Sequence, residues 1–86
     1  MMPPEVTVYT TQFCGYCFAA KRLLGQRGIT YREVDVTSDT AKRAWLVDTT
    51  KRRTVPQIFI GDASIGGYDD LKAMDQSGEL AQLLSS

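Results

Sequence analysis

Residues 6–17 read VTVYTTQFCGYC and contain both cysteines of the chain, Cys14 and Cys17. Two cysteines separated by two residues serve as half of a zinc site, as a structural staple or as a redox centre. Structural zinc needs four ligands, usually Cys or His, and this chain has no histidine and no third cysteine, which leaves only a zinc site shared across a dimer. A structural disulfide that closes so short a loop would lower the entropy of the unfolded chain only slightly. The redox interpretation is therefore favoured, and a CxxC motif beside a βαβ pattern is its usual sign.

The residues around this pair predict that it lies where a strand passes into a helix. Val6–Thr10 is a β-branched and aromatic run, typical of a strand. Apolar residues then recur at helical spacing as far as Leu24, and Gly28 is expected to end the helix. Cys14 would then lie at the helix N-terminus, where unpaired N–H groups and the dipole stabilise a thiolate. Cysteines in such positions have pKa values lowered to about 3.5–7.5.

The two cysteines are expected to have unequal roles. Cys17 lies one helical turn after Cys14, and residues three apart share a helix face. Cys17 can therefore reach the sulfur of Cys14, but it is further from the dipole and is expected to be more buried. We predict that Cys14 attacks and that Cys17 resolves.

Composition limits the classes of function. The 86 residues predict a single domain, residues 1–86. Ten basic and ten acidic residues give no net charge, so neither nucleic acid nor a membrane surface is expected to attract the chain. No apolar run approaches the roughly 20 residues of a membrane span, and the first residues lack the layout of a signal peptide. A cytoplasmic monomer is expected, and in a reducing compartment an isolated CxxC motif is catalytic more often than structural.

The remaining pattern predicts a small α/β domain. Further strands are expected at residues 31–36, 57–60 and 63–65, the last two joined by a hairpin turn at Gly61 and Asp62. A helix capped by Ser38 should run to about Thr49, and Asp69 and Asp70 should begin a third helix. Residues 80–84 form a last turn or short helix. The order β-α-β-α-β-β-α predicts a four-stranded mixed sheet with helices on both faces and a parallel first strand pair.

Three motifs in this order resemble those of a dithiol glutaredoxin: CGYC at residues 14–17, TVP at residues 54–56 and GGYDD at residues 66–70. The resemblance extends from Val6 to Leu84. It implies a thioredoxin-like fold, with the sheet flanked by three helices. It also implies that Pro56 is cis and faces the cysteines; from the sequence alone, this proline would only begin an edge strand.

The resemblance further implies a glutathione site. The backbone of Val55 would pair with the cysteinyl unit of the tripeptide, and the N–H groups at Tyr68 and Asp69 would hold the γ-glutamyl carboxylate. The Asp69 carboxylate would take the ammonium group, and Arg43 the glycyl carboxylate. The expected binding residues are Thr11, Tyr16, Arg43, Thr54, Val55, Pro56, Gly67, Tyr68 and Asp69. Asp70 is interpreted either as a ligand contact or as a helix N-terminal charge.

One position departs from the family pattern. Many glutaredoxins carry lysine three residues before the first cysteine, and this chain has Thr11. The loss of that charge weakens the expected glutathione site unless Arg43 and Arg53 compensate. Lys51 and Arg52 are interpreted as a solvated charged turn.

The resemblance implies a glutathione-dependent thiol–disulfide oxidoreductase, with Cys14 as nucleophile, Cys17 as resolving cysteine, glutathione as reductant and no metal. Its substrates would be disulfide-bearing or glutathionylated proteins, ribonucleotide reductase among them. Two alternatives remain open. One is a thioredoxin-like redoxin reduced by a flavoprotein reductase. The other is a dimer that carries a [2Fe–2S] cluster on Cys14 and glutathione, for which Gly15 in place of the commoner proline is the relevant feature.

Overall fold

The computed structural model describes residues 4–85, which form four strands and four helices. In chain order these are β1 (Val6–Thr10), α1 (Gly15–Gln26), β2 (Tyr31–Asp35), α2 (Thr40–Thr50), β3 (Gln57–Ile60), β4 (Ala63–Gly66), α3 (Tyr68–Ser77) and α4 (Glu79–Leu84). The predicted element order is confirmed, and the C-terminal segment is a separate short helix because Gly78 adopts a left-handed φ of 85° between α3 and α4. None of the helices in the described range has the length and apolarity that crossing a membrane requires.

The four strands form one mixed sheet in the order β2-β1-β3-β4. β1 and β2 are parallel, as the intervening helix α1 requires. β3 runs antiparallel to β1 and forms a hairpin with β4, and the turn between them has Gly61 at a φ of 60°. The carboxyl end of β1 therefore leads directly to the two cysteines at the start of α1.

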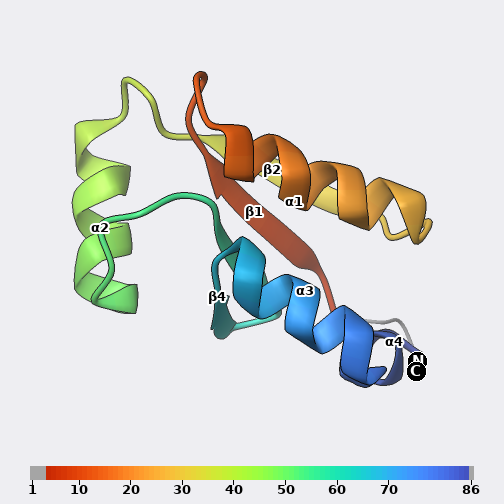
Figure 1. The fold of residues 1–86 in the computed structure, drawn as a ribbon. Coiled ribbons are helices and arrows are strands. Elements are labelled where there is room, and N and C mark those ends of the chain that lie inside the picture. The colour runs from red at the N-terminus through yellow and green to blue at the C-terminus, as the bar shows by residue number, and fades with distance from the viewer. Residues whose placement is uncertain (1–3, 86) are drawn as a thin grey trace.

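The sheet separates two layers of helices, with α2 on one face and α1, α3 and α4 on the other (Figure 1). Because side chains alternate across a strand, each strand contributes to both faces. The larger core joins sheet residues to helix residues and contains Val6, Val8, Ala20, Leu24, Ile58, Ile60, Leu71 and Leu80. A smaller core beneath α2 contains Val36, Leu46 and Phe59. The predicted helices on both faces are confirmed.

The expected start of α2 is wrong by one residue. Asp39, and not Ser38, is the N-cap, and its carboxylate accepts a hydrogen bond of 2.9 Å from the Lys42 N–H group. The Thr37 N–H group donates to the Asp35 carboxylate at 2.8 Å, so the chain makes a turn before the helix can begin. The helix ends at Thr50, followed by Lys51 in the left-handed region with a φ of 61°.

Candidate active site

Cys14 is the N-cap of α1, as the sequence predicts. Its backbone is extended, and its sulfur accepts a hydrogen bond of 3.0 Å from the Cys17 N–H group. The two cysteines form a disulfide with a Cα–Cα distance of 5.2 Å. The sulfur of Cys14 thus occupies the end of the helix where the N–H groups lack intrahelical partners and favour an anion. Within residues 4–85, no group of three or more His, Cys, Asp or Glu side chains is placed to bind a metal ion.

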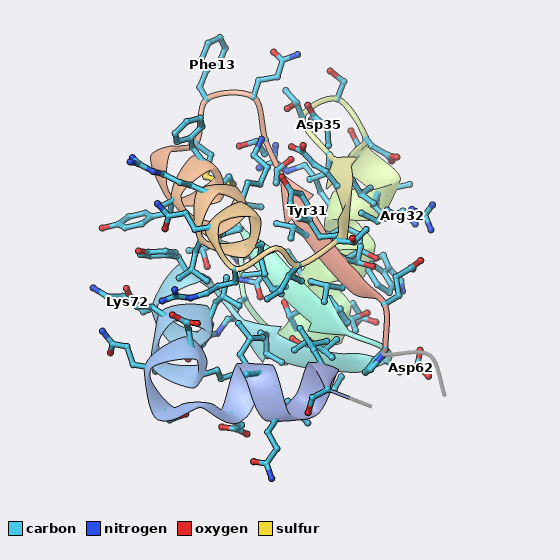
Figure 2. The ribbon with its side chains drawn as sticks, turned by 90° about the vertical axis from the view of Figure 1, so that its right-hand side faces the viewer. Phe13, Tyr31, Arg32, Asp35, Asp62 and Lys72 are labelled. Atoms are coloured by element: carbon cyan, nitrogen blue, oxygen red, sulfur yellow. A yellow bond between two sulfur atoms is a disulfide. The ribbon has the colours of Figure 1, made fainter. Side chains whose placement is uncertain are left out.

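Access to the two sulfurs differs strongly. Cys17 is only 1% exposed, whereas Cys14 is half-buried. Figure 2 shows Phe13 projecting outward from the turn between β1 and α1, where it is 97% exposed beside Cys14. An incoming sulfur can therefore approach Cys14 from solvent but cannot approach Cys17. This confirms the predicted difference in burial between the two cysteines.

The loop before β3 places a backbone segment against Cys14. The Val55–Pro56 peptide is cis, as the family resemblance implied. The Cys14 sulfur lies 3.6 Å from the Val55 carbonyl oxygen; in a disulfide the sulfur carries no proton, so this is a contact and not a hydrogen bond. The buried Gln57 side chain holds the loop from behind by donating a hydrogen bond of 2.8 Å to the Thr54 carbonyl. Val55 is thereby fixed beside the reacting atom.

The start of α3 forms the opposite wall of the site. Asp70 accepts hydrogen bonds from the Gly67 N–H group at 2.9 Å and from the Arg52 guanidinium at 3.0 Å. These two contacts, the Gly67 N–H first and then Arg52, hold the pKa of the Asp70 carboxyl below its usual value. Asp70 therefore supports the start of the helix, in agreement with its interpretation as a helix N-terminal charge, and its place in the lining of the hollow keeps the ligand contact open. The N–H groups of Tyr68 and Asp69, at the first two positions of the helix, remain available to an anion.

Between these two walls lies a hollow of about 390 Å³. Its lining residues come from α1, the TVP loop and the start of α3: Tyr16, Arg52, Thr54, Val55, Pro56, Gly67, Tyr68, Asp69 and Asp70. Two of these residues, Tyr16 and Tyr68, stack on each other with ring centroids 6.1 Å apart. Seven of the nine expected binding residues therefore lie together, and only Thr11 and Arg43 do not line this hollow.

A second hollow of about 480 Å³ adjoins the first and contains Arg43. It lies between α2 and the loop before β3, and the two hollows share Arg52, Thr54 and Val55. Thr11 follows β1 and lines neither hollow. The structure thus connects Arg43 to the site through the shared wall but does not place Thr11 in it.

Arg52 lines the candidate site but is not among the expected binding residues. It is exposed, as the interpretation as a solvated turn predicts, but that interpretation missed its ion pair with Asp70, 18 positions away, and its place in both hollows. No periodicity marks residues 51–56, so its only signal in the sequence was its place just before the TVP motif.

The comparisons with known proteins agree with this geometry. The family model for glutaredoxin matches residues 6–65. The chain is 44% identical over 85 residues to a glutaredoxin of Pseudomonas aeruginosa, covering 99% of this chain and 100% of the relative. It is 44% identical over 80 residues to glutaredoxin 3 of Escherichia coli K12, covering 93% and 96%. The crystal structure of the buckwheat glutaredoxin–glutathione complex matches with a TM-score of 0.89 at 33% identity, over 95% of this chain and 77% of that one. With its redox-active cysteine pair at the N-terminus of α1 and its thioredoxin-like sheet, this chain belongs to the glutaredoxin family of thiol oxidoreductases.

Proposed function

We propose that the protein is a glutathione-dependent thiol–disulfide oxidoreductase that reduces protein disulfides and glutathione mixed disulfides. The arrangement of charge around Cys14 carries this proposal. Val55, which contacts the Cys14 sulfur, lines two hollows: one contains Asp69 and the start of α3, and the other contains Arg43. Glutathione has a carboxylate and an ammonium group at one end, a carboxylate at the other and a thiol between them, which matches this order of charges.

The expected contacts follow from the chemistry of each group. The cysteinyl unit of glutathione pairs with the backbone of Val55, as one strand pairs with another. Its γ-glutamyl carboxylate accepts hydrogen bonds from the N–H groups of Tyr68 and Asp69, and the Asp69 carboxylate binds its ammonium group. Arg43 binds the glycyl carboxylate. The buckwheat relative, which was crystallised as a complex with glutathione, supports binding in this family.

Reduction of a protein–glutathione mixed disulfide needs only Cys14. The Cys14 thiolate attacks the glutathione sulfur, and the protein thiolate leaves with the electron pair of the broken S–S bond. A second glutathione thiolate then attacks the glutathionylated Cys14, which releases oxidised glutathione and restores the Cys14 thiolate. A reducing compartment such as the cytoplasm supplies the glutathione that this cycle consumes.

Reduction of a protein disulfide needs both cysteines. Cys14 attacks one sulfur of the substrate, and the Cys17 thiolate then attacks Cys14, which releases the reduced protein and leaves the disulfide seen in the structure. Two glutathione molecules return this disulfide to the dithiol. The 5.2 Å separation of the two Cα atoms is within the usual range for such a bond.

The choice of reductant tests the proposal. With a glutathionylated protein as substrate, we expect turnover when glutathione and glutathione reductase are supplied, and none with thioredoxin reductase alone. Activity only with thioredoxin reductase would replace the proposal with the thioredoxin-like alternative. A visible spectrum recorded after anaerobic expression tests the other alternative, in which Cys14, the one accessible cysteine of each subunit, ligates a cluster. A [2Fe–2S] spectrum from a protein without disulfide-reducing activity would overturn the proposed oxidoreductase function.

Changes at Thr11 and Arg43 are expected to alter the KM for glutathione modestly and in opposite directions. A lysine introduced by Thr11→Lys should favour the Cys14 thiolate and add a contact to the glycyl carboxylate. At a largely solvated site such a charge is worth on the order of 0.2–1 kcal/mol, so the KM for glutathione should fall by up to about fivefold. Arg43→Ala should raise this KM by a similar factor.

Steady-state kinetics at low and high salt measure both changes, because screening weakens exposed charges. Arg22→Ala is the control, since Arg22 is an exposed arginine on α1 that lines neither hollow of the site. If Thr11→Lys leaves the thiolate titration and the KM unchanged at low salt, position 11 does not face the site.

A further inference from the structure

We propose that the hollow beneath α2 selects protein substrates in which acidic residues directly follow the reacting cysteine. This inference rests on the proposed function for the direction in which the substrate chain runs. It adds a class of polypeptide substrate to the reaction and assigns a binding role to Arg53, to which the proposed contacts with glutathione assign no partner.

The hollow is strongly basic. We call it the arginine groove, and its polar lining consists of Arg43, Arg52, Arg53, Thr37, Thr40 and Thr54. Its other described lining residues are apolar, so no carboxylate lines it within the described part of the chain. The charge of Arg52 is offset by its ion pair with Asp70. Among residues 4–85, neither Arg43 nor Arg53 forms an ion pair, and both are exposed.

Two uncompensated positive charges exceed what glutathione needs. The glycyl end of glutathione carries one carboxylate, which a single guanidinium can bind through two hydrogen bonds. If Arg43 takes this carboxylate, Arg53 remains without a negative partner. A polypeptide with two consecutive acidic side chains would match both arginines.

The groove is close enough to the reacting sulfur to contact such a polypeptide. It shares Thr54 and Val55 with the hollow that contains the glutathione site, and the Val55 carbonyl oxygen lies 3.6 Å from the Cys14 sulfur. A substrate cysteine bonded to Cys14 and paired with Val55 is therefore next to the groove. An extended chain advances about 3.3 Å per residue, so the first and second neighbours of the cysteine lie over the groove.

The direction of the chain follows from the proposed orientation of glutathione. Its γ-glutamyl unit is placed at the start of α3 and its glycine at Arg43, so the chain enters the groove in the direction from cysteine to C-terminus. A polypeptide that pairs with Val55 in the same sense places its following residues in the groove. Its preceding residues meet the start of α3, where the Asp69 carboxylate repels acidic side chains and the charge of Asp70 is offset by Arg52. Residues before and after the substrate cysteine thus meet charges of opposite sign.

Isomeric peptides isolate this effect. The two peptides are Ala-Ala-Cys-Glu-Glu and Glu-Glu-Cys-Ala-Ala, with blocked termini and each as a mixed disulfide with thionitrobenzoate. Reduced Cys17→Ser protein supplies the Cys14 thiolate. Its attack on the peptide sulfur releases the thionitrobenzoate anion, whose absorbance reports the rate, and leaves the peptide bonded to Cys14.

We expect the peptide with acidic residues after the cysteine to react faster than its isomer, on the order of fivefold at low salt, with a smaller ratio at high salt. Adding Arg53→Gln should lower this ratio, and adding Arg43→Gln as well should bring it close to one. Arg22→Gln, on α1 and outside the groove, should leave the ratio as it was. Because every ratio compares isomers of one composition, differences in intrinsic reactivity cancel between variants.

Equal rates for the two isomers, or a preference for the isomer with acidic residues first, would overturn the inference. So would a ratio that survives the double replacement of Arg43 and Arg53, or one that Arg22→Gln lowers as much. The glutathione reductase assay on the same protein separates this result from the proposed function. If the protein turns over with glutathione but shows no isomer preference, only the proposed role of the arginine groove is rejected. If it shows the preference but does not turn over with glutathione, the charge selectivity of the groove is supported and glutathione is rejected as the reductant.

Discussion

Replacing Cys14 with serine should abolish both deglutathionylation and disulfide reduction, with losses of roughly three orders of magnitude or more. The thiolate is the nucleophile in thiol–disulfide exchange, and a serine hydroxyl is neither ionised at neutral pH nor able to form the mixed disulfide. Cys14 is the sulfur at the N-terminus of α1 and beside Val55, whereas the other sulfur is buried. Turnover of a glutathionylated protein coupled to glutathione reductase measures the loss.

Cys17→Ser should separate the two reactions. Deglutathionylation should continue, because its two steps use only Cys14 and glutathione. Reduction of a protein disulfide should fall steeply, because the mixed disulfide is no longer resolved from within the protein. Since Cys17 is only 1% exposed, a buried hydroxyl could lower stability, so Cys17→Ala and a thermal unfolding curve accompany the measurement. Equal loss of both reactions in folded Cys14 and Cys17 variants would contradict the division of roles.

The parts of the fold that the sequence predicted well depend on local physics. β1 and β3 have the predicted bounds because each is a short run rich in β-branched and aromatic residues, and Pro56 and Gly61 flank β3. The end of α1 follows from Gly28, whose φ of 69° lets the chain leave the helix. The position of Cys14 at the start of α1 follows from the same two signals, a strand before it and helical spacing after it.

The start of α2 was predicted one residue too early because local interactions do not distinguish between two neighbouring N-cap residues. Ser38 and Asp39 are both good N-caps, and the choice between them depends on a turn held from outside the helix. The Gln12 N–H group donates to the Thr37 hydroxyl at 2.9 Å, which ties this turn to the loop after β1. A contact between residues 25 positions apart has no periodic trace in the sequence.

The same reason applies to the candidate site. The walls of the first hollow could be predicted because the TVP and GGYDD motifs are part of the family resemblance. Their connection through Arg52 and Asp70 arises only when the loop before β3 reaches α3 in three dimensions. An ion pair between exposed side chains leaves no hydrophobic pattern, so the sequence could not distinguish it from a solvated turn.

Gly66→Ala is expected to destabilise the fold by about 2–4 kcal/mol, from backbone strain and the loss of a helix cap. Gly66 has a φ of 107°, in the region that favours glycine. A Cβ atom there would collide with the Asp70 carboxylate and approach Arg52 within 2.9 Å. Asp70 would have to leave the Gly67 N–H group, which removes the cap of α3 and disturbs the end of the helix proposed to bind the γ-glutamyl carboxylate. Both the free energy of unfolding in urea and the KM for glutathione should report the change.

Two other glycines separate the causes of this effect. Gly78 also has a positive φ, of 85°, but its Cβ would meet no atom within 4 Å, so Gly78→Ala measures backbone strain alone. Gly25 lies inside α1 without a positive φ and with equal space, so Gly25→Ala should stabilise by roughly 0.5–1 kcal/mol. Only Gly66→Ala should raise the KM for glutathione, because only this change displaces Asp70. If Gly66→Ala costs no more stability than Gly78→Ala and leaves the KM unchanged, then the contact of Asp70 with Gly67 and Arg52 does not organise the glutathione end of the site.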